Sequence, residues 1–323
     1  MRRHTLVVNA VLSMLRIDIF GGRFFMSDNA ASLHRKGTLL VVAAAICWSL
    51  GGLIARQITV EPWVTVGWRG AIAAVALLIF LLIRDGRQTW SHFRNMGPGG
   101  IGVGICFATA SISFVIALEH ATVALILVVQ STAPLIAGLL AWVWMGERLG
   151  WPRVIAMLVA LSGILLMVSK AEGHTDATGM ILSGVIAISF ACATVLTRRY
   201  SHVRMTPATC LGTAIMGIIG FCMAGVESLD VSTSDLFYLF LFGAVQLSIG
   251  LIFFTTGARL IPAAEAALIS LVETVLGAFW VFLFLGENPG VFALYGGALV
   301  LAAVAGNTLY DQRRAARQPL NVA

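Results

Sequence analysis

The feature that most constrains this chain is a succession of ten apolar segments, each about as long as a membrane is thick. A hydrocarbon core of about 30 Å needs roughly 20 apolar residues in a helix. The segments are continuous rather than alternating, which excludes a membrane β-barrel. The predicted spans are residues 37–57, 62–83, 98–118, 121–144, 151–170, 177–198, 206–226, 235–257, 262–285 and 289–310. The predicted fold class is therefore an all-α polytopic membrane protein with ten transmembrane helices.

The composition agrees with this fold class. Hydrophobic residues make up 59% of the 323 residues and charged residues only 11%, whereas a soluble domain carries about a quarter charged residues. Most of the surface therefore faces the lipid bilayer. The five cysteines all lie within apolar segments and form no metal-ligand spacing. We predict buried thiols, with no disulfide framework, no metal site and no cofactor.

The basic residues are distributed unequally between the two sides of the predicted bundle. Of the 21 Lys and Arg residues, 18 lie on the side of the N-terminus, Arg56 and Lys170 lie on the other side, and Arg69 lies within a span. Short loops rich in Lys and Arg stay in the cytoplasm. This asymmetry accounts for the net charge of +6 without a nucleic-acid partner. We predict that both termini are cytoplasmic, in a bacterial inner membrane.

The two ends of the chain stand apart from the spans. Residues 1–36 are predicted to form a cytoplasmic N-terminal arm, and residues 311–323 a cytoplasmic tail. The apolar stretch near the start is too short to span, and no signal-peptide cleavage site follows it. Met26 opens a segment that leads directly into the first strong span. Either translation starts at Met26, or the first 25 residues lie on the membrane surface as an amphipathic arm.

The chain repeats itself. Residues 121–150 align without gaps against residues 261–290, and residues 44–57 align more weakly against 187–199, with one residue more in the first copy. Two units follow, 37–170 and 177–310, with five predicted spans each. Because five is an odd number, the second unit must lie upside down relative to the first. Inverted repeats are typical of alternating-access transporters, whose binding sites lie near mid-membrane between the repeats.

The aligned segments ALEHATVALILVVQSTAPLIAGLLAWVWMGERL and LIPAAEAALISLVETVLGAFWVFLFLGE closely resemble the paired segments of EamA-type domains in the drug/metabolite transporter superfamily. The resemblance covers residues 37 to 310 approximately. It implies two inverted five-helix halves, a central cavity, and ATP-independent efflux or exchange of amino acids, related metabolites or drugs. Members commonly have Glu-Pro where this chain has Glu273-Thr274. The resemblance therefore implies a weaker kink in the ninth span, while the fourth keeps Pro134.

Three ionisable residues lie within predicted spans, where such side chains usually face a cavity or a partner. Glu273 lies about 16 Å along its span, near mid-membrane. It either binds a substrate ammonium or couples transport to protons, or else it is a structural carboxylate. Arg69, at similar depth, either clamps a substrate carboxylate or pairs with an acid such as Glu273. Glu265 follows Pro262 in the first helical turn, where the helix dipole stabilises a carboxylate, and is interpreted as structural.

Polar and aromatic side chains at corresponding depths complete the candidate cavity, although such residues also form hydrogen bonds between helices. Helical spacing places Ser270 and Trp280 on the same face as Glu273. The candidate substrate-binding residues are Trp48, Arg69, Gln130, Ser131, Ser189, Gln246, Ser270, Glu273 and Trp280. Glu273 is also the candidate for proton coupling, and no catalytic residue is assigned.

The sequence lacks the motifs of other membrane protein classes. It contains no nucleotide-binding P-loop, no H-E-x-x-H motif and no G-x-S-x-G motif, so an ATP-driven pump and a membrane-embedded enzyme are disfavoured. The primary hypothesis is a secondary transporter that exports or exchanges a small metabolite by alternating access. The alternative is a non-transporting receptor or subunit on the same scaffold. A second copy of the chain, in a homodimer, is a further candidate partner.

Overall fold

A computed structural model describes residues 30–147, 150–169, 176–225, 230–285 and 290–317. Met26 and most of the predicted N-terminal arm lie outside these residues, as do Lys170 and residues 318–323 of the predicted tail. The described residues form helices and turns and contain no strand. Within the described ranges, nine helices are long and apolar enough to cross a membrane, and Trp151–Met167 is a shorter apolar helix of 17 residues. These ten segments correspond to the ten predicted spans and confirm the fold class.

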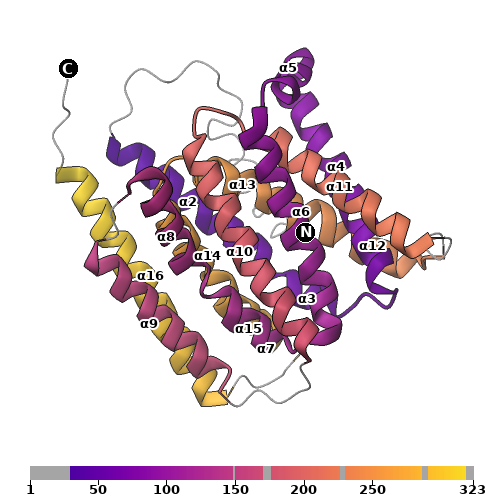
Figure 1. Cartoon of the computed structure of the whole chain (residues 1–323). Helices are drawn as coiled ribbons and strands as arrows, with labels where there is room; N and C mark the ends of the chain where they lie inside the picture. The colour runs from indigo at the N-terminus through magenta and orange to yellow at the C-terminus, as the bar shows by residue number, and fades with distance from the viewer. Residues whose placement is uncertain (1–29, 148–149, 170–175, 226–229, 286–289, 318–323) are drawn as a thin grey trace, which may run out of the picture.

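Several crossings consist of two or more helical pieces (Figure 1). In chain order the crossings are α2 with α3 (Ala30–Ser49, Gly51–Ala55), α4 (Pro62–Asp85), α6 (Gly97–His120), α7 with α8 (Val123–Gln130, Ala133–Met145), α9 (Trp151–Met167), α10 (Ala177–Arg199), α11 (Thr206–Ala224), α12 with η3 and α13 (Thr233–Phe240, Leu241–Ile249, Gly250–Gly257), α14 with α15 (Ala263–Ser270, Val272–Leu285) and α16 (Gly290–Arg317). The segment η3 is a π-helix. A short 3-10 turn, η1 (Gly86–Gln88), and helix α5 (Thr89–Arg94) follow α4.

Local sequence signals set the helix ends. Proline occupies the first turn of α4, α6, α8, α9 and α11, where its missing N–H has no helical partner to lose. The side chains of Thr122, Asp176 and Ser232 accept hydrogen bonds from backbone amides three residues ahead, as N-caps do. Gly146 closes α8 in the left-handed conformation, with φ 68°, which favours glycine. The short loops and helix ends therefore contain the residues that begin and end each membrane-spanning helix.

The packing of the helices is preserved when the two halves of the chain are exchanged. The helix α4 packs against α11 and α9 packs against α16, so each lies beside its counterpart (Figure 1). In the same way, α6 packs against α10 as α13 packs against α2. Each half contributes five crossings. The structure is thus a bundle of two inverted halves around a pseudo-two-fold axis.

A pair of glycines makes this symmetry visible at the residue level. A Cβ atom on Gly37 would lie 2.7 Å from Ile261 and 2.8 Å from Leu260, and one on Gly179 would lie 2.6 Å from Ala121. Ala121 and Ile261 are the first residues of the gapless repeat alignment. In each half, a glycine in the N-terminal part of the first helix therefore packs against the residues that precede the broken helix of the other half. These broken helices are α14 with α15 for Gly37, and α7 with α8 for Gly179.

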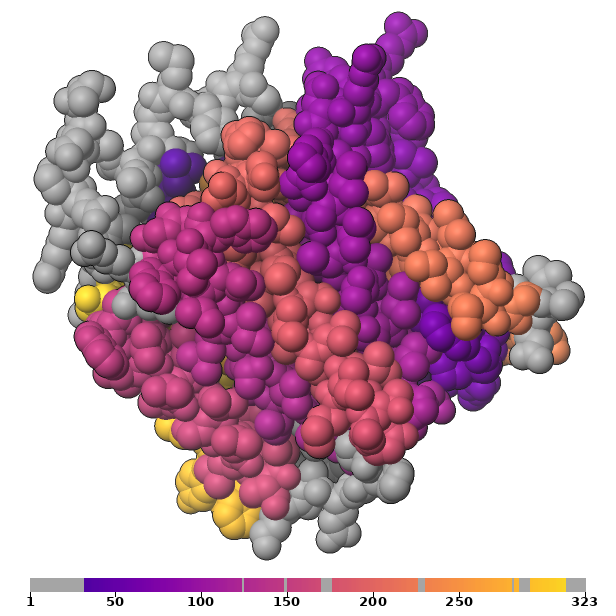
Figure 2. Space-filling model, in the orientation of Figure 1, coloured from indigo at the N-terminus to yellow at the C-terminus, as the bar shows by residue number. Residues whose placement is uncertain are grey.

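The two ends of the bundle differ in charge. We call the end that carries Arg84, Arg153, Arg198, Arg204 and Arg259 the arginine-rich end, and the end that carries Arg56, Glu61, His120, Asp176 and Asp235 the opposite end. Figure 2 shows that the last turns of α4 and the helix α5 project from the bundle at the arginine-rich end. These ends follow the two sides that the Lys and Arg count distinguishes.

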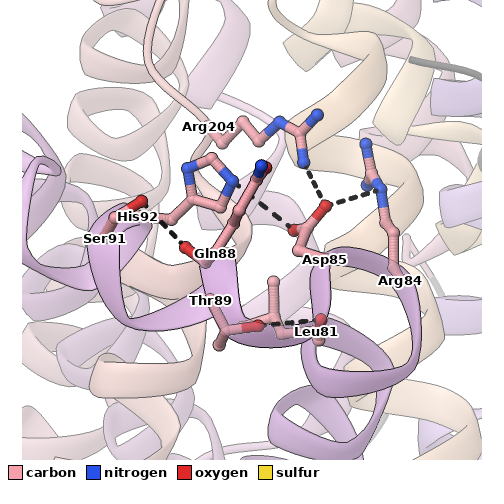
Figure 3. A network of polar contacts seen from close by, with 8 residues as sticks. All are labelled: Leu81, Arg84, Asp85, Gln88, Thr89, Ser91, His92 and Arg204. Carbon is pink, nitrogen blue, oxygen red and sulfur yellow. Dashed lines mark hydrogen bonds and ion pairs between the residues drawn. The ribbon is translucent and has the colours of Figure 1, made fainter.

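Asp85 organises one part of the arginine-rich end (Figure 3). Its carboxylate accepts a hydrogen bond from Arg204, just before α11, and lies 3.7 Å from Arg84 and 3.9 Å from His92. Nearby, Thr89 donates to the backbone carbonyl of Leu81 over 3.0 Å. One carboxylate thus joins the end of α4 to α5 and to the second half of the chain.

The contact between α4 and α11 depends on glycine. A Cβ atom on Gly70 would lie 2.7 Å from the Cα of Gly217 and 2.8 Å from the carbonyl oxygen of Thr213. These are backbone atoms, which cannot move aside without shifting a helix. Small residues that allow such close approach are a common basis of helix association in membranes.

We therefore expect Gly70→Ala to destabilise the fold by about 1–3 kcal/mol, as overpacking does. Gly184 is the matched control, because a Cβ atom there would meet nothing within 4 Å and alanine favours helix. Thermal unfolding of the purified variants in one detergent measures the difference. Equal stability of Gly70→Ala and the native chain would show that the two helices are not in tight contact.

Candidate functional site

A cavity of about 360 Å³ lies between the two halves of the bundle. Its wall combines helices from both halves, because α2, α4, α6 and α7 of the first half and α10, η3 and α15 of the second all contribute side chains. Five predicted site residues line it, namely Trp48, Arg69, Gln130, Gln246 and Glu273. The volume lies within the range of small-molecule sites, about 300–1,000 Å³.

Arg69 is held in the wall by the π-helical segment of the second half. Its side chain is 3% exposed. Nη2 donates to Oε1 of Gln246 over 3.0 Å, and the guanidinium carbon lies 3.9 Å from the ring centroid of Phe242. Nε and Nη1 have no hydrogen-bond partner in the described part of the chain. The cation is therefore stabilised by an amide and an aromatic face, with donors left over.

Gln246 joins this cation to the break in the first crossing. Its Nε2 donates to the backbone carbonyl of Trp48 over 3.1 Å, close to the point where α2 ends and α3 begins. A helix that is interrupted within a membrane exposes backbone groups that need new partners. Gln246 serves as such a partner through Nε2, while its Oε1 accepts the hydrogen bond from Arg69.

Glu273 lies on the opposite repeat, near the break in the ninth crossing. The helix is interrupted at Leu271, between α14 and α15, at the position aligned with the break at Ser131–Thr132 between α7 and α8. The break persists although Thr274 replaces the proline expected from the family resemblance. The interruption spans one residue here and two in the fourth crossing, which contains Pro134. The carboxylate of Glu273 faces the cavity with no hydrogen-bond or ion-pair partner among the described residues.

Arg69 and Glu273 both line the cavity but do not contact each other. They are near enough to attract electrostatically, but the described residues contain no ion pair between them within 4.0 Å. The structural pairing considered for these two residues is therefore absent in this conformation. A guanidinium group and a carboxyl group instead face one cavity from different helices.

Aromatic rings form the apolar part of the site. Trp48 and Phe190 meet edge to face with ring centroids 5.9 Å apart, and Phe254 lies 5.1 Å from Trp48 and 5.2 Å from Phe190. Phe107 packs 6.0 Å from Phe254. One aromatic from each of α2, α6, α10 and α13 thus meets near the pseudo-two-fold axis. Sequence reasoning missed Phe107 and Phe190, although the repeat alignment places Phe190 within one residue of the position of Trp48.

The other four predicted residues lie outside the cavity lining. Ser131 and Ser270 are buried and donate to their own helices, at the carbonyls of Val128 and Ala266. Ser189 is half-buried. Trp280 donates from Nε1 to Oγ of Ser49 over 2.9 Å, and so supports a residue that does line the cavity. A role of these four in substrate contact stays a prediction.

The cavity reaches toward the opposite end of the bundle. Its lining there includes Arg56 at the end of α3, Val123 at the start of α7 and Ala293 near the start of α16. The arginine-rich end is closed by contacts between the halves, such as Arg198 to Glu147 at 3.3 Å and Arg199 to the carbonyl of Trp144 at 2.7 Å. Burial lowers the pKa of Arg259 to about 10, which fits a tightly packed closure.

We expect Gln246→Leu to destabilise the protein by about 2 kcal/mol, because it removes a hydrogen bond from a buried cation. In the double variant Arg69→Met/Gln246→Leu the cation that needs the amide of residue 246 is itself absent, so the loss should be smaller than the sum of the two single losses. The coupling energy between residues 69 and 246 is obtained from the unfolding free energies of the native protein, the two single variants and the double variant in mixed micelles. Strictly additive losses would contradict the contact between these side chains.

Comparison with known proteins agrees with this architecture. The model of the EamA-like transporter family matches residues 35–169 and 177–309. A probable terminal-alkyne amino-acid exporter of Streptantibioticus cattleyicolor is 29% identical over 62% of this chain and 71% of its own length. The pseudopaline exporter CntI of Pseudomonas aeruginosa is 24% identical over 84% of this chain and 95% of its own length.

Two further relatives extend the likeness over nearly the whole bundle. An uncharacterized inner membrane transporter, YicL of Salmonella typhimurium, is 25% identical over 87% of this chain and 98% of its own length. A protein of known crystal structure, 20% identical, matches with a TM-score of 0.74 over 87% of this chain and 99% of its own, so the two share a fold. Because the family model covers both inverted halves, the chain belongs to the EamA-like transporter family of multi-pass membrane proteins.

Proposed function

We propose that this protein is a secondary transporter of a bacterial inner membrane that exports a small zwitterionic metabolite, such as an amino acid, by alternating access. The observation that carries the proposal is the cavity between the inverted halves. Its lining contains Arg69, whose Nε and Nη1 lack hydrogen-bond partners among the described residues, and the unpartnered carboxyl group of Glu273. Such a site near the repeat interface is typical of transporters that rock one half against the other. Relatives named as exporters support the outward direction.

The chemistry of the wall supports a zwitterion. A substrate carboxylate would accept hydrogen bonds from Nε or Nη1 of Arg69, after a movement that brings these buried donors to the cavity surface. A substrate ammonium would pair with Glu273, and the rings of Trp48 and Phe190 would contact an apolar side chain. Each partner would satisfy a group that is costly to leave unpaired in a membrane protein.

The orientation in the membrane follows from the distribution of charge. The positive-inside rule favours a cytoplasmic arginine-rich end, and we propose that both termini lie on that side. The cavity then faces outward in this conformation. Export would require the arginine-rich end to open and load substrate from the cytoplasm, before the bundle returns to the outward-facing state.

The cavity favours transport over a non-transporting receptor. A receptor or subunit on this scaffold would be expected to have an occluded core in which Arg69 and Glu273 are locked together. The cavity is instead open toward one end and keeps these two groups apart. Because Arg69 and Glu273 form no ion pair with each other, both groups are available to bind a substrate.

Glu273 is the proposed coupling residue, and counterflow tests this role. We expect a proton gradient to accelerate net flux of a labelled substrate in proteoliposomes, and Glu273→Gln to remove that acceleration. If Glu273 carries the proton, gradient-free counterflow should persist in the variant. Loss of both activities would indicate a substrate contact instead. Glu61→Gln, an exposed carboxylate at the opposite end, is the control, and unchanged gradient-driven flux through Glu273→Gln would refute coupling there.

A panel of substrate analogues tests the proposed zwitterion. We expect an amino acid to compete for transport at least tenfold better than its methyl ester, because the ester gives Arg69 a weaker acceptor. In a folded Arg69→Lys variant this preference should shrink, since a lysine offers a point charge rather than a planar fork. Competition constants in the native protein and the variant provide the measurement. Equal competition by acid and ester would exclude carboxylate recognition.

A further inference from the structure

A histidine and a carboxylate meet inside the arginine-rich end, away from the cavity. Nε2 of His34, in the first turns of α2, lies 3.1 Å from Oε1 of Glu265, in the first turn of α14. Their side chains are 11% and 0% exposed. Nε2 of His34 and both carboxylate oxygens of Glu265 have no other hydrogen-bond partner in the described part of the chain. His34 is therefore the contact that compensates this buried carboxylate.

The other charges near this pair cancel each other. Arg153 of α9 and Asp311 of α16 both act electrostatically on His34 and Glu265. They form their own ion pair at 3.0 Å, and Asn307 donates to the same Asp311 oxygen over 3.1 Å. Because this second pair is neutral as a whole, it does not supply the charge that His34 or Glu265 needs. The first pair must balance itself.

Burial fixes the number of protons on the pair. A charged carboxylate beside a neutral imidazole would leave one net charge out of water, which is expensive. One proton removes that net charge, whether it lies on the imidazole of His34 or on the carboxyl group of Glu265. Closed packing of α2 against α14 therefore requires one bound proton.

The equivalent place at the opposite end of the bundle is built differently. There His120, at the end of α6, lies 2.9 Å from Asp176, which caps α10, and both side chains are 39% exposed. The backbone amide of Gly179 and the side chain of His120 hold the pKa of Asp176 below its ordinary value. This carboxylate is solvated and stays ionised near neutral pH without a protonated histidine. The residue aligned with Glu265 in the first half is Leu125.

We propose that His34 and Glu265 form a proton-binding site that couples closure of the arginine-rich end to the uptake of one proton from the water on that side. The proposal rests on the alternating access of the proposed function, because it requires α2 and α14 to separate when this end opens. In the open state water solvates both groups, so the imidazole releases its proton to that water and Glu265 stays ionised. Closing takes the proton back.

The direction of the effect follows from proton linkage. A hydrated imidazole titrates near pH 6.5, so below about that pH the open state already holds the proton that closing needs. Above it, each pH unit should change the ratio of open to closed molecules by about tenfold in favour of the open state. Acidification of the compartment at the arginine-rich end would therefore hold the protein with its cavity facing the opposite end.

Double electron–electron resonance measures this equilibrium without a substrate. Spin labels are placed in opposite halves, at Arg35→Cys on α2 and at Tyr310→Cys on α16, which packs against α14, in full-length protein whose five native cysteines are replaced. Both labelled side chains are exposed. In nanodiscs between pH 5.5 and 8.5, we expect a short-distance population that grows as the pH falls and a long-distance population that grows as it rises.

Variants of the pair give distinct signatures. Glu265→Gln has no buried carboxylate, so its distance distribution should not depend on pH above about 6.5, where the hydrated imidazole of His34 is already neutral. His34→Gln leaves Glu265 to bind the proton alone, so the open population at pH 7 should increase and the titration should move to lower pH. His120→Gln, at the exposed equivalent, should titrate as the native protein does.

The proposal and the proposed function fail in different ways. A native distribution that does not change with pH, or a Glu265→Gln variant that titrates like the native protein, would overturn the proton site. A pH-dependent distribution in a protein that moves no amino acid would leave the site intact and refute the substrate assignment. The measurement needs folded protein, which the temperature of unfolding of each variant establishes beforehand.

Discussion

Inside a membrane, a backbone N–H or C=O that loses its helical partner must find another within the protein, and this constraint determines where the present bundle can be irregular. The first, fourth and ninth crossings are broken. The side chain of Gln246 binds the carbonyl of Trp48 beside the first break, and Ser131 binds the carbonyl of Val128 beside the second. Trp48, Gln130 and Glu273 lie beside the three breaks, and all three line one cavity.

The sequence was sufficient for the spans and their duplication, because both depend on patterns that the chain itself displays. The gapless alignment of residues 121–150 with 261–290 even places the two helix breaks at the same position. The weaker kink inferred from Thr274 holds only in part, since the ninth crossing is still interrupted at Leu271. There the amide of Leu271 turns back to the carbonyl of Leu268 over 3.1 Å, so a tighter turn breaks the helix without proline.

Five of the nine candidate site residues line the cavity, because a sequence indicates roughly how far along a helix a residue lies but not which way its side chain faces around the helix axis. Ser131 and Ser270 lie at suitable depths, yet their hydroxyl groups bind carbonyls of their own helices, an option open to every serine in a helix. Phe107 and Phe190 line the cavity, but an aromatic residue within an apolar span looks the same whether it faces lipid or a substrate. Only the packing of helices from both halves separates these cases.

The symmetry of the backbone and the asymmetry of the charges have different consequences. Two inverted halves with equivalent contacts allow the bundle to open at either end, because each closed end has a counterpart. The charged groups break this equivalence, since Ala133 occupies the position aligned with Glu273 and the histidine–carboxylate pair is buried at one end and exposed at the other. An exposed pair contributes little to stability, whereas a buried pair is sensitive to the loss of one partner or one proton. In the proposed alternating-access mechanism, the inverted fold provides the two states, and the placement of a few ionisable side chains decides which of them is favoured.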